Sequence, residues 1–492
     1  MSMSEVRTAS GAVRGRLESG VAVFRGIPFA AAPVGEHRFA APQPVPHWDG
    51  VRPALSFGPP PPQPDLFGRP EASGDEWLTV NVWSPDPGAE LPVMVWFHGG
   101  GYTIGASSSP EYDGGRLARD GGVVVVTFNY RVGFEGFAQI AGAPPNRGLL
   151  DQIAALEWVR DNVTAFGGDP SRVTIFGESA GAGSIAALLA MPRAAGLFRR
   201  AVAQSVPGAF FSTELAADIA TACAGELGSR PTRAELSTVD PALLVAAAET
   251  LMTERPPRWG RAGLRSILFA PVVDGDVLPG TPWPALAAGA GRDIDLLVGH
   301  TRDEQRLFTA LDGLLGQVTP ELADAALTDF APHGEHGYRD GFPDAGPDEL
   351  YELVHSDWLF RMPSLHLAEA QADGGGRVHA YELTWPAPGL GGTFGACHGL
   401  DVPLVFGNLT SGRPALLIGE TPSPEAETLS ARMRTAWTTF AADADPGWPA
   451  YDTSDRLTRI FDVHPAVTAY PEEVSRRIWQ DHTFPALPLD TR

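Results

Sequence analysis

Apolar residues in the first half of the chain are grouped in short runs that turn-forming residues separate. The segments 93–97 and 123–128 are almost continuously apolar, which is typical of parallel strands covered on both faces. The segment 151–162 instead has the spacing of an amphipathic helix. Strands and helices that alternate in this way predict an α/β protein with a mostly parallel, doubly wound sheet.

The N-terminal part, residues 5–90, has a different pattern of short alternating runs punctuated by glycine. The runs 12–16 and 21–26 predict strands of an antiparallel edge, and the run 78–83 predicts a further strand. The segment 57–74 contains four consecutive prolines at 59–62, which exclude a helix or a central strand. We expect a long surface loop there.

The second half of the chain mixes a few strand signals with long helical stretches. Strands are predicted at 201–204, 296–299 and 378–383. Two helical regions, at about 210–265 and 305–370, are interpreted as insertions that cap the carboxyl edge of the sheet. A length of 492 residues is compatible with one core carrying large insertions or with two lobes. We expect one catalytic domain over 5–482, followed by a loosely held tail at 483–492.

One stretch combines a strand, a G-x-S-x-G motif and a helix of small residues. Residues 173–176 are strand-forming and lead into Gly177-Glu178-Ser179-Ala180-Gly181, and the predicted helix extends to Met191. A serine hydroxyl is a poor nucleophile, so it has to be exposed on a rigid turn and served by a base. A sharp strand-to-helix turn provides this, and it would direct the Ala180 N–H toward a developing oxyanion.

A second glycine-rich segment, His98-Gly99-Gly100-Gly101-Tyr102, directly follows the strand that ends at Phe97. Three glycines allow the backbone to approach a substrate closely and to turn its N–H groups inward. The alternative is an ordinary turn after a strand. The presence of the serine motif favours an oxyanion loop.

A serine nucleophile requires a base and an acid further along the chain, in the order that α/β-hydrolases use. Among the 12 histidines, His398 follows the strand near 380 and its glycine-rich loop. Asp303 and Glu304 follow the strand 296–299. Spacing alone does not choose between these two carboxylates.

Composition narrows the possible chemistry. All 36 basic residues are arginine, which excludes Schiff-base lysines, P-loop lysines and Ser-Lys dyads. A net charge of −23 argues against nucleic acid or anionic membranes as partners. The two cysteines, Cys223 and Cys397, form no disulfide framework, and the N-terminus has no apolar signal region. We expect a cytoplasmic protein, and the bias toward Arg, Ala, Gly and Pro is our basis for expecting a bacterial one.

Two other polar clusters have simpler interpretations. His333 and His336 lie in a glycine-rich segment without a third ligand at a fixed spacing, so we expect a solvated loop and no metal site. Asp274-Gly275-Asp276 predicts a turn in an extended connection.

The motifs together resemble the type-B carboxylesterases, the cholinesterase-like branch of the α/β-hydrolases, and in particular their bacterial para-nitrobenzyl esterase-like members. The similarity covers nearly the whole chain. The segments that carry it are 24–30, 129–133, 148–152, 166–170, 176–181 and 398–407.

The resemblance implies the α/β-hydrolase fold and a role for each candidate. It places Ser179 at the nucleophile, His398 at the general base and Glu304, rather than Asp303, at the triad acid. It also implies that the oxyanion donors are the N–H groups of Gly100, Gly101 and Ala180. Glu178 matches an acidic position that faces the pocket in cholinesterases, and a pocket role for it here is a hypothesis.

Three positions depart from the family pattern. Trp77 replaces a common cysteine, so the disulfide that closes the preceding loop in many relatives is absent. Val206 and Gln305 replace common glycines after the Gln-Ser pair and after the triad glutamate. Both changes are expected to reshape the acyl side of the pocket.

The sequence therefore predicts a cofactor-free serine hydrolase that cleaves small-molecule carboxylic esters through an acyl-enzyme. An amidase or carbamate hydrolase with the same triad remains open, because leaving-group preference depends on pocket shape. A non-catalytic binding protein on this fold is the third alternative, which the presence of all three triad residues disfavours. The sequence does not indicate the physiological ester or the oligomeric state.

Overall fold

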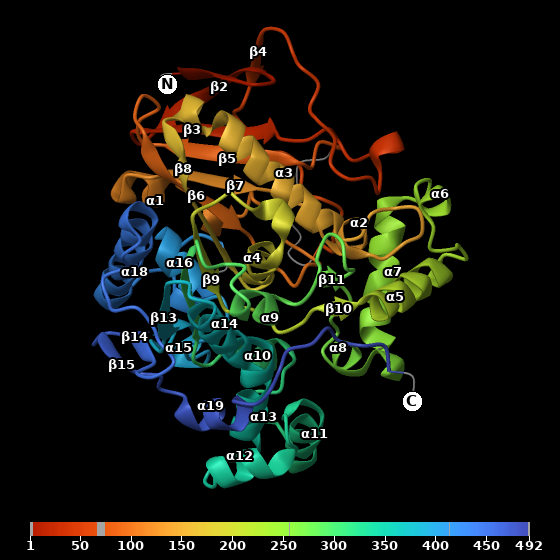
Figure 1. Cartoon of the computed structure of the whole chain (residues 1–492), viewed down its shortest axis with the longest axis vertical. Helices are drawn as coiled ribbons and strands as arrows, with labels where there is room; N and C mark the ends of the chain where they lie inside the picture. The colour runs from red at the N-terminus through yellow and green to blue at the C-terminus, as the bar shows by residue number, and fades with distance from the viewer. Residues whose placement is uncertain (1–2, 66–73, 255, 413, 491–492) are drawn as a thin grey trace. The chain divides into compact units, whose positions relative to one another are not determined.

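The computed structural model describes residues 3–65, 74–254, 256–412 and 414–490. They form two compact units, the first from 1–200, 209–281 and 486–492 and the second from 201–208 and 282–485. Each unit combines strands with helices, in agreement with the predicted α/β class (Figure 1). Part of the predicted proline-rich loop, residues 66–73, lies outside the described residues.

The strands of the first unit follow the order β1-β2-β3-β5-β7-β6-β8, with β4 beside β2. Neighbours from β1 to β7 along this order are antiparallel, whereas β6 runs parallel to both β7 and β8. The antiparallel N-terminal edge is therefore confirmed. The strands are β1 (Met3–Thr8), β2 (Gly11–Glu18), β3 (Val21–Pro28), β4 (Val51–Pro53), β5 (Thr79–Ser84), β6 (Leu91–Phe97), β7 (Val124–Phe128) and β8 (Gly168–Glu178).

The parallel strands of this unit show why their sequences are so apolar. Every residue of β7 is buried, and so is every residue of β6 after its first. A strand covered on both faces cannot alternate apolar and polar residues, because each side chain faces packed protein. β8 begins at Gly168, earlier than the sequence predicts, so the break after the preceding helix falls at Gly167, where φ is +81°.

Helices of the first unit include the predicted ones at 151–162 and 180–191 and those of the region 210–265. In this region α5 and α7 lie side by side (Figure 1). A short parallel pair, β10 (Phe211–Ser212) with β11 (Val272–Val273), was not predicted. The helices are α1 (Gly115–Gly121), α2 (Gly133–Phe137), α3 (Arg147–Asn162), α4 (Ala180–Ala190), α5 (Thr213–Glu226), α6 (Arg233–Leu236), α7 (Pro241–Glu254) and α8 (Gly260–Leu264).

The strands of the second unit follow the order β9-β12-β13-β14-β15. β13 runs parallel to β12 and to β14, and β15 closes the edge antiparallel to β14. The last two strands were not predicted. The five strands are β9 (Arg200–Gln204), β12 (Asp295–Thr301), β13 (Val378–Leu383), β14 (Leu457–Phe461) and β15 (Ala466–Ala469).

The helical region 305–370 is confirmed in the second unit. Helix α14 packs against β12 and β13, and α11 packs against α13 (Figure 1). His336 lies within α12 and not in the loop that we expected. The helices are α9 (Pro282–Ala287), α10 (Arg306–Leu311), α11 (Pro320–Phe330), α12 (Glu335–Gly341), α13 (Pro347–Ser356), α14 (Met362–Asp373), α15 (Gly389–Gly392), α16 (Asp401–Phe406), α17 (Pro414–Ile418), α18 (Pro424–Asp443) and α19 (Glu473–Trp479).

The C-terminal residues differ from the expected loosely held tail. Within the second unit, the ring of Phe484 stacks on that of Trp479 at a centroid distance of 6.0 Å. Within the first unit, Leu487 bridges to Phe211, and its N–H donates to the carbonyl oxygen of Phe210. These contacts hold Phe484 and Leu487 in place, so this part of the tail is not loosely held. Across the described part of the chain, no helix is long and apolar enough to cross a membrane.

A buried ion pair connects the loop after β7 to helix α3. The guanidinium of Arg131 donates to both carboxylate oxygens of Asp151, at 2.8 and 2.7 Å, and to the carbonyl oxygen of Ala40 at 2.8 Å. The backbone N–H of Arg131 donates to the same carboxylate at 3.0 Å. Both side chains are fully buried, so each depends on the other for neutralisation.

Replacing Asp151 by Asn should lower the free energy of unfolding by about 3–5 kcal/mol, because the Arg131 cation would stay buried without a counterion. Urea unfolding followed by tryptophan fluorescence measures this loss. The exposed pair of Arg160 and Asp161 provides the control, and Asp161→Asn should leave the unfolding midpoint unchanged. Equal midpoints for Asp151→Asn and the wild type would contradict the role of the buried pair.

Candidate functional site

Ser179 alone separates strand β8 from helix α4. Its backbone has φ +56° and ψ −124°, a conformation that is strained for any residue with a side chain. A Cβ atom on Gly181 would lie 2.0 Å from the carbonyl oxygen of Phe97, and one on Gly177 would lie 2.7 Å from the same atom. The predicted sharp turn is present, and its close packing explains both glycines.

The glycine-rich loop 98–102 leaves the sheet beside this turn. Phe97 at the end of β6 pairs in register with Gly177 of β8, so both loops leave the same edge of the first unit's sheet. Gly100 has φ +114°, and a Cβ atom there would lie 2.1 Å from the carbonyl oxygen of Ile104. Gly101 has φ +60°. Ala180 is the first residue of α4, where backbone N–H groups have no acceptor inside the helix.

The contacts of His98 with Tyr130 hold the start of this loop in place. Its ring stacks on Tyr130 at a centroid distance of 4.3 Å, and the Tyr130 hydroxyl donates to the His98 carbonyl oxygen at 2.7 Å. Burial lowers the pKa of His98 to about 4, although a hydrogen bond with the Gly99 carbonyl opposes this effect. His98 is therefore neutral near neutral pH and acts as a structural residue.

Glu178 precedes the nucleophile candidate and is buried. Its carboxylate lies against the glycine-rich loop, because a Cβ atom on Gly99 would lie only 2.8 Å from Glu178 Oε2. The first unit therefore contains the serine, the glycine-rich loop and one carboxylate in a small region.

The second unit brings Glu304 and His398 together. Glu304 Oε2 lies 2.5 Å from His398 Nδ1. Because a carboxylate only accepts, Nδ1 carries the proton, and Nε2 is left as the basic nitrogen of the neutral ring. The other carboxylate oxygen accepts from the Ser205 hydroxyl at 2.6 Å and from the Thr301 N–H at 2.9 Å.

The charge of Glu304 is retained although the side chain is fully buried. Burial alone would raise the pKa of the carboxyl group. The electrostatic attraction to the His398 ring and the hydrogen bonds from His398 and Ser205 outweigh burial, and the pKa of Glu304 lies below its ordinary value. Glu304 can therefore remain ionised beside the imidazole.

Asp303, the alternative that spacing left open, has a different environment. Its carboxylate accepts from the Ala396 N–H at 2.8 Å and pairs with Arg302 at 3.0 Å. Its own N–H donates to the Ala396 carbonyl at 2.9 Å, and a bridge links Asp303 to Cys397. Asp303 thus fastens the loop of Glu304 to the loop of His398.

The sequence did not reveal three neighbours of this acid–base pair. Ser205 is the serine of the Gln-Ser pair, and nothing in the sequence indicates its positive φ of +58°. The rings of Phe360 and Phe308 lie near the His398 ring, at centroid distances of 4.1 and 5.3 Å. Phe360 is nearly parallel to the imidazole, with an interplanar angle of 29°.

Phe360 lies in a π-helical turn, Asp357–Arg361, between α13 and α14. Arg361 anchors this turn by pairing with Asp357 at 3.0 Å and with Glu472 at 2.8 Å. The Tyr338 hydroxyl donates to Asp357 at 2.7 Å. No local motif marks this π-helical turn, because it also depends on Tyr338 and Glu472, which lie outside it in the sequence.

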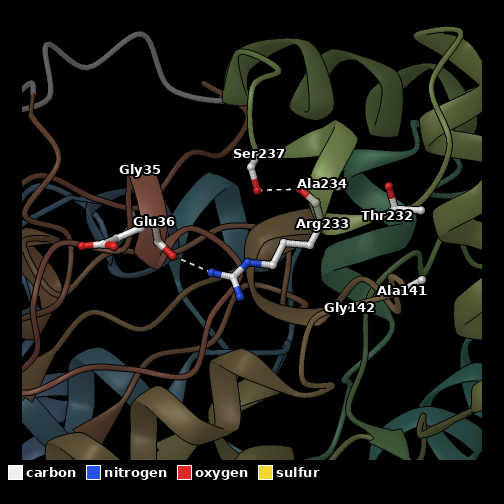
Figure 2. A pocket seen from close by; sticks show the side chains of 8 residues that line it. All are labelled: Gly35, Glu36, Ala141, Gly142, Thr232, Arg233, Ala234 and Ser237. Carbon is white, nitrogen blue, oxygen red and sulfur yellow. Dashed lines mark hydrogen bonds between the residues drawn. The ribbon is translucent and has the colours of Figure 1, made fainter.

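A surface hollow of about 450 Å³ in the first unit contains none of the candidates (Figure 2). Arg233 crosses it to donate to the carbonyl oxygen of Glu36, and the Ser237 hydroxyl donates to the carbonyl oxygen of Arg233. Within the described ranges, no cluster of three or more His, Cys, Asp and Glu side chains is arranged to hold a metal ion. The Asp274 side chain accepts from three following N–H groups, as the predicted turn requires.

Comparisons with known proteins identify the family to which the chain belongs. The profile described as "Carboxylesterase family" matches residues 2–332 and 339–472. Para-nitrobenzyl esterase of Bacillus subtilis is 39% identical, over 96% of this chain and 97% of the relative. A probable N-octanoylanthranilate hydrolase of Rhodococcus erythropolis is 34% identical, over 93% and 97%. A crystal structure of a Geobacillus stearothermophilus carboxylesterase superposes with a TM-score of 0.87, at 38% identity over 97% of this chain and 100% of that one.

Replacing Ser205 by Ala should lower the free energy of unfolding by about 1.5–3 kcal/mol near pH 7, because Glu304 would lose a charge-assisted hydrogen bond. Since the folded pKa of Glu304 lies below its ordinary value of 4.5, its stabilising effect is present above that value. The effect is lost as the pH falls through the folded pKa. The difference between variant and wild type should therefore shrink toward acid pH.

Urea unfolding of both proteins at neutral and acid pH measures this difference. Ser430→Ala is a matched control, because the Ser430 hydroxyl is also buried but donates to the carbonyl oxygen of Leu404. Its cost should not depend on pH. A Ser205→Ala cost that is equally independent of pH would contradict the assignment.

Proposed function

This chain is a carboxylic ester hydrolase of the carboxylesterase family, and we propose that Ser179 is its nucleophile, His398 its general base and Glu304 the acid that orients the base. The α/β-hydrolase fold is shared with the solved carboxylesterases. We further propose that residues 5–482 act as one catalytic domain that needs no cofactor.

The backbone of Ser179 is the observation that carries this proposal. A left-handed conformation on a residue with a side chain is costly, by roughly 1–3 kcal/mol, and persists only where the surroundings enforce it. Here glycines at 177 and 181, packed against Phe97, enforce it. A turn of this kind holds a serine hydroxyl rigidly at the end of a strand, as nucleophilic attack requires.

The pair of His398 and Glu304 supports the base role. With Nδ1 bound to Glu304, only Nε2 is available to take the hydroxyl proton of Ser179. The serine oxygen then forms a bond to the ester carbonyl carbon. The alcohol leaves with the proton from Nε2, and a water molecule activated by the same nitrogen cleaves the acyl-enzyme to a carboxylic acid.

Gly100, Gly101 and Ala180 are proposed to stabilise the tetrahedral oxyanion. Their positions after β6 and at the start of α4 supply backbone N–H groups at one edge of the first unit's sheet. Glu178, which lies against Gly99, is proposed to bring negative charge to the substrate pocket.

The cellular location of the enzyme, its binding partners and a second activity are also proposals. We propose an enzyme of the bacterial cytoplasm, because the composition is biased toward Arg, Ala, Gly and Pro and both cysteines are free. We also propose that it acts on small-molecule esters and binds neither nucleic acid nor anionic membranes, which the net charge of −23 disfavours as partners. A second candidate activity is the hydrolysis of N-acyl substrates, because a relative that is 34% identical bears the name N-octanoylanthranilate hydrolase. The same nucleophile, base and oxyanion donors would serve that reaction.

Replacing Ser179 by Ala should reduce ester turnover by about four to six orders of magnitude, because the covalent route is removed. Hydrolysis of para-nitrophenyl acetate, butyrate and octanoate measures the loss and gives a profile of acyl-chain length. A para-nitroanilide of the preferred acyl group tests the N-acyl alternative. Ser184→Ala is the control, because Ser184 is a buried serine of helix α4, which follows Ser179, and its hydroxyl accepts from Gln152. Turnover that survives in Ser179→Ala would refute the nucleophile.

Replacing Phe360 by Leu should lower kcat by about 2- to 15-fold with little change in KM, because a stacked ring contributes about 0.5–1.5 kcal/mol beyond its buried area. Leucine fills most of the volume but has no flat face to hold the imidazole. Phe330→Leu is the matched control, since Phe330 lies 4.7 Å from the ring of His355 in the same unit. Equal losses in kcat for the two variants would indicate a general packing effect.

A further inference from the structure

A second hollow, of about 360 Å³, lies in the second unit and is lined by residues of helix α18, of the loop after it and of strand β14. Figure 1 shows where α18 and β14 lie in the chain. Ala431 and Arg432 line it from one face of α18, Gly447 and Trp448 from the connecting loop, and Arg459 and Phe461 from β14. None of the residues proposed for ester hydrolysis lines it. Its volume is within the range of small-molecule sites.

Two guanidinium groups share this hollow without an acidic partner. Within the described part of the chain, neither Arg432 nor Arg459 pairs with a carboxylate. Arg432 donates to the carbonyl oxygen of Val463 at 3.1 Å, and Arg459 has a buried Nε that makes no hydrogen bond. Burial and, secondly, the nearby charge of Arg432 lower the pKa of Arg459. The two cations therefore repel each other.

This arrangement is unusual for the chain, whose net charge is −23. Elsewhere in the same unit, Arg476 and Arg477 share the carboxylate of Glu473 at 2.6 and 2.8 Å. Asp445 precedes the part of the loop that lines the hollow, and its carboxylate accepts from the N–H of Gly447 at 2.8 Å, which caps its own turn. A bound anion would relieve the repulsion and satisfy the free donor edges.

The aromatic side chains hold one guanidinium in place. Arg459 lies over the ring of Phe461 at 5.5 Å and over that of Trp448 at 6.0 Å. Trp448 is itself fixed, because its indole N–H donates to the carbonyl oxygen of Ala380 at 3.0 Å. A guanidinium stacked in this way keeps its N–H donors directed outward from its edge, which is the geometry that carboxylate and phosphate groups bind.

We propose that this hollow binds the anionic group of a small molecule, a carboxylate or a phosphate, between Arg432 and Arg459. The apolar part of the ligand would lie against Ala431 and the neighbouring loop. The site is separate from the ester-hydrolysing residues and does not depend on their assignment.

Isothermal titration with inorganic phosphate and with benzoate, at constant ionic strength set by chloride, tests the proposal. We expect saturable binding of at least one anion that weakens at least tenfold in Arg459→Gln and in Arg432→Gln. Binding of phosphate alone would identify a phosphoryl ligand, and binding of benzoate alone a carboxylate. Arg193→Gln is the control, because Arg193 is an exposed arginine of the first unit that pairs with Asp276 at 3.0 Å.

Both arginine variants should retain wild-type hydrolysis of para-nitrophenyl esters, which shows that they are folded. Two outcomes would overturn the proposal. One is the absence of saturable binding of either anion to the wild type. The other is binding that persists unchanged in the double variant, since such binding belongs to another part of the protein.

Discussion

The tight contact between the turn at Ser179 and the end of β6 constrains the first unit more than any other feature of the candidate site. Phe97 occupies the space that side chains at 177 and 181 would need, so only glycine fits at these two positions. This packing enforces the strained backbone at Ser179. The same register brings the glycine-rich loop to the same edge. One steric constraint therefore positions a hydroxyl, a helix N-terminus and a flexible loop together.

In the second unit the main constraint is different, because a carboxylate has to stay ionised although it is shielded from solvent. Glu304 is fully buried, and its charge is stabilised by His398, by Ser205 and by the Thr301 N–H. Each donor comes from a different segment, and Asp303 fastens two of these segments to each other. A buried charge is tolerated only when it is paired and hydrogen-bonded. The network thus ties the fold of this unit to the protonation state of one side chain.

The sequence predicted the features that depend on local chemistry. Continuous apolar runs gave β6 and β7, because strands covered on both faces have no other composition. The turn at Ser179 was predictable because only glycine fits at positions 177 and 181, which gives the turn a recognisable motif. Strands β14 and β15 were missed since they are short and partly exposed, as an edge allows. Asp303 and Glu304 were indistinguishable by spacing, because only the fold decides which carboxylate faces His398.

The residues that the sequence does not reveal are those that position other side chains by packing against them. Phe360 reaches the imidazole from a π-helical turn in which Arg361 pairs with Asp357 of the same turn and with Glu472, which is far away in the sequence. Many apolar residues could occupy such a position, so no residue type marks it. The proposed nucleophile, in contrast, is marked by its residue type and by the glycines two positions before and after it. Sequence motifs therefore identify the atoms that react, whereas the side chains that hold those atoms emerge only when distant segments are packed together.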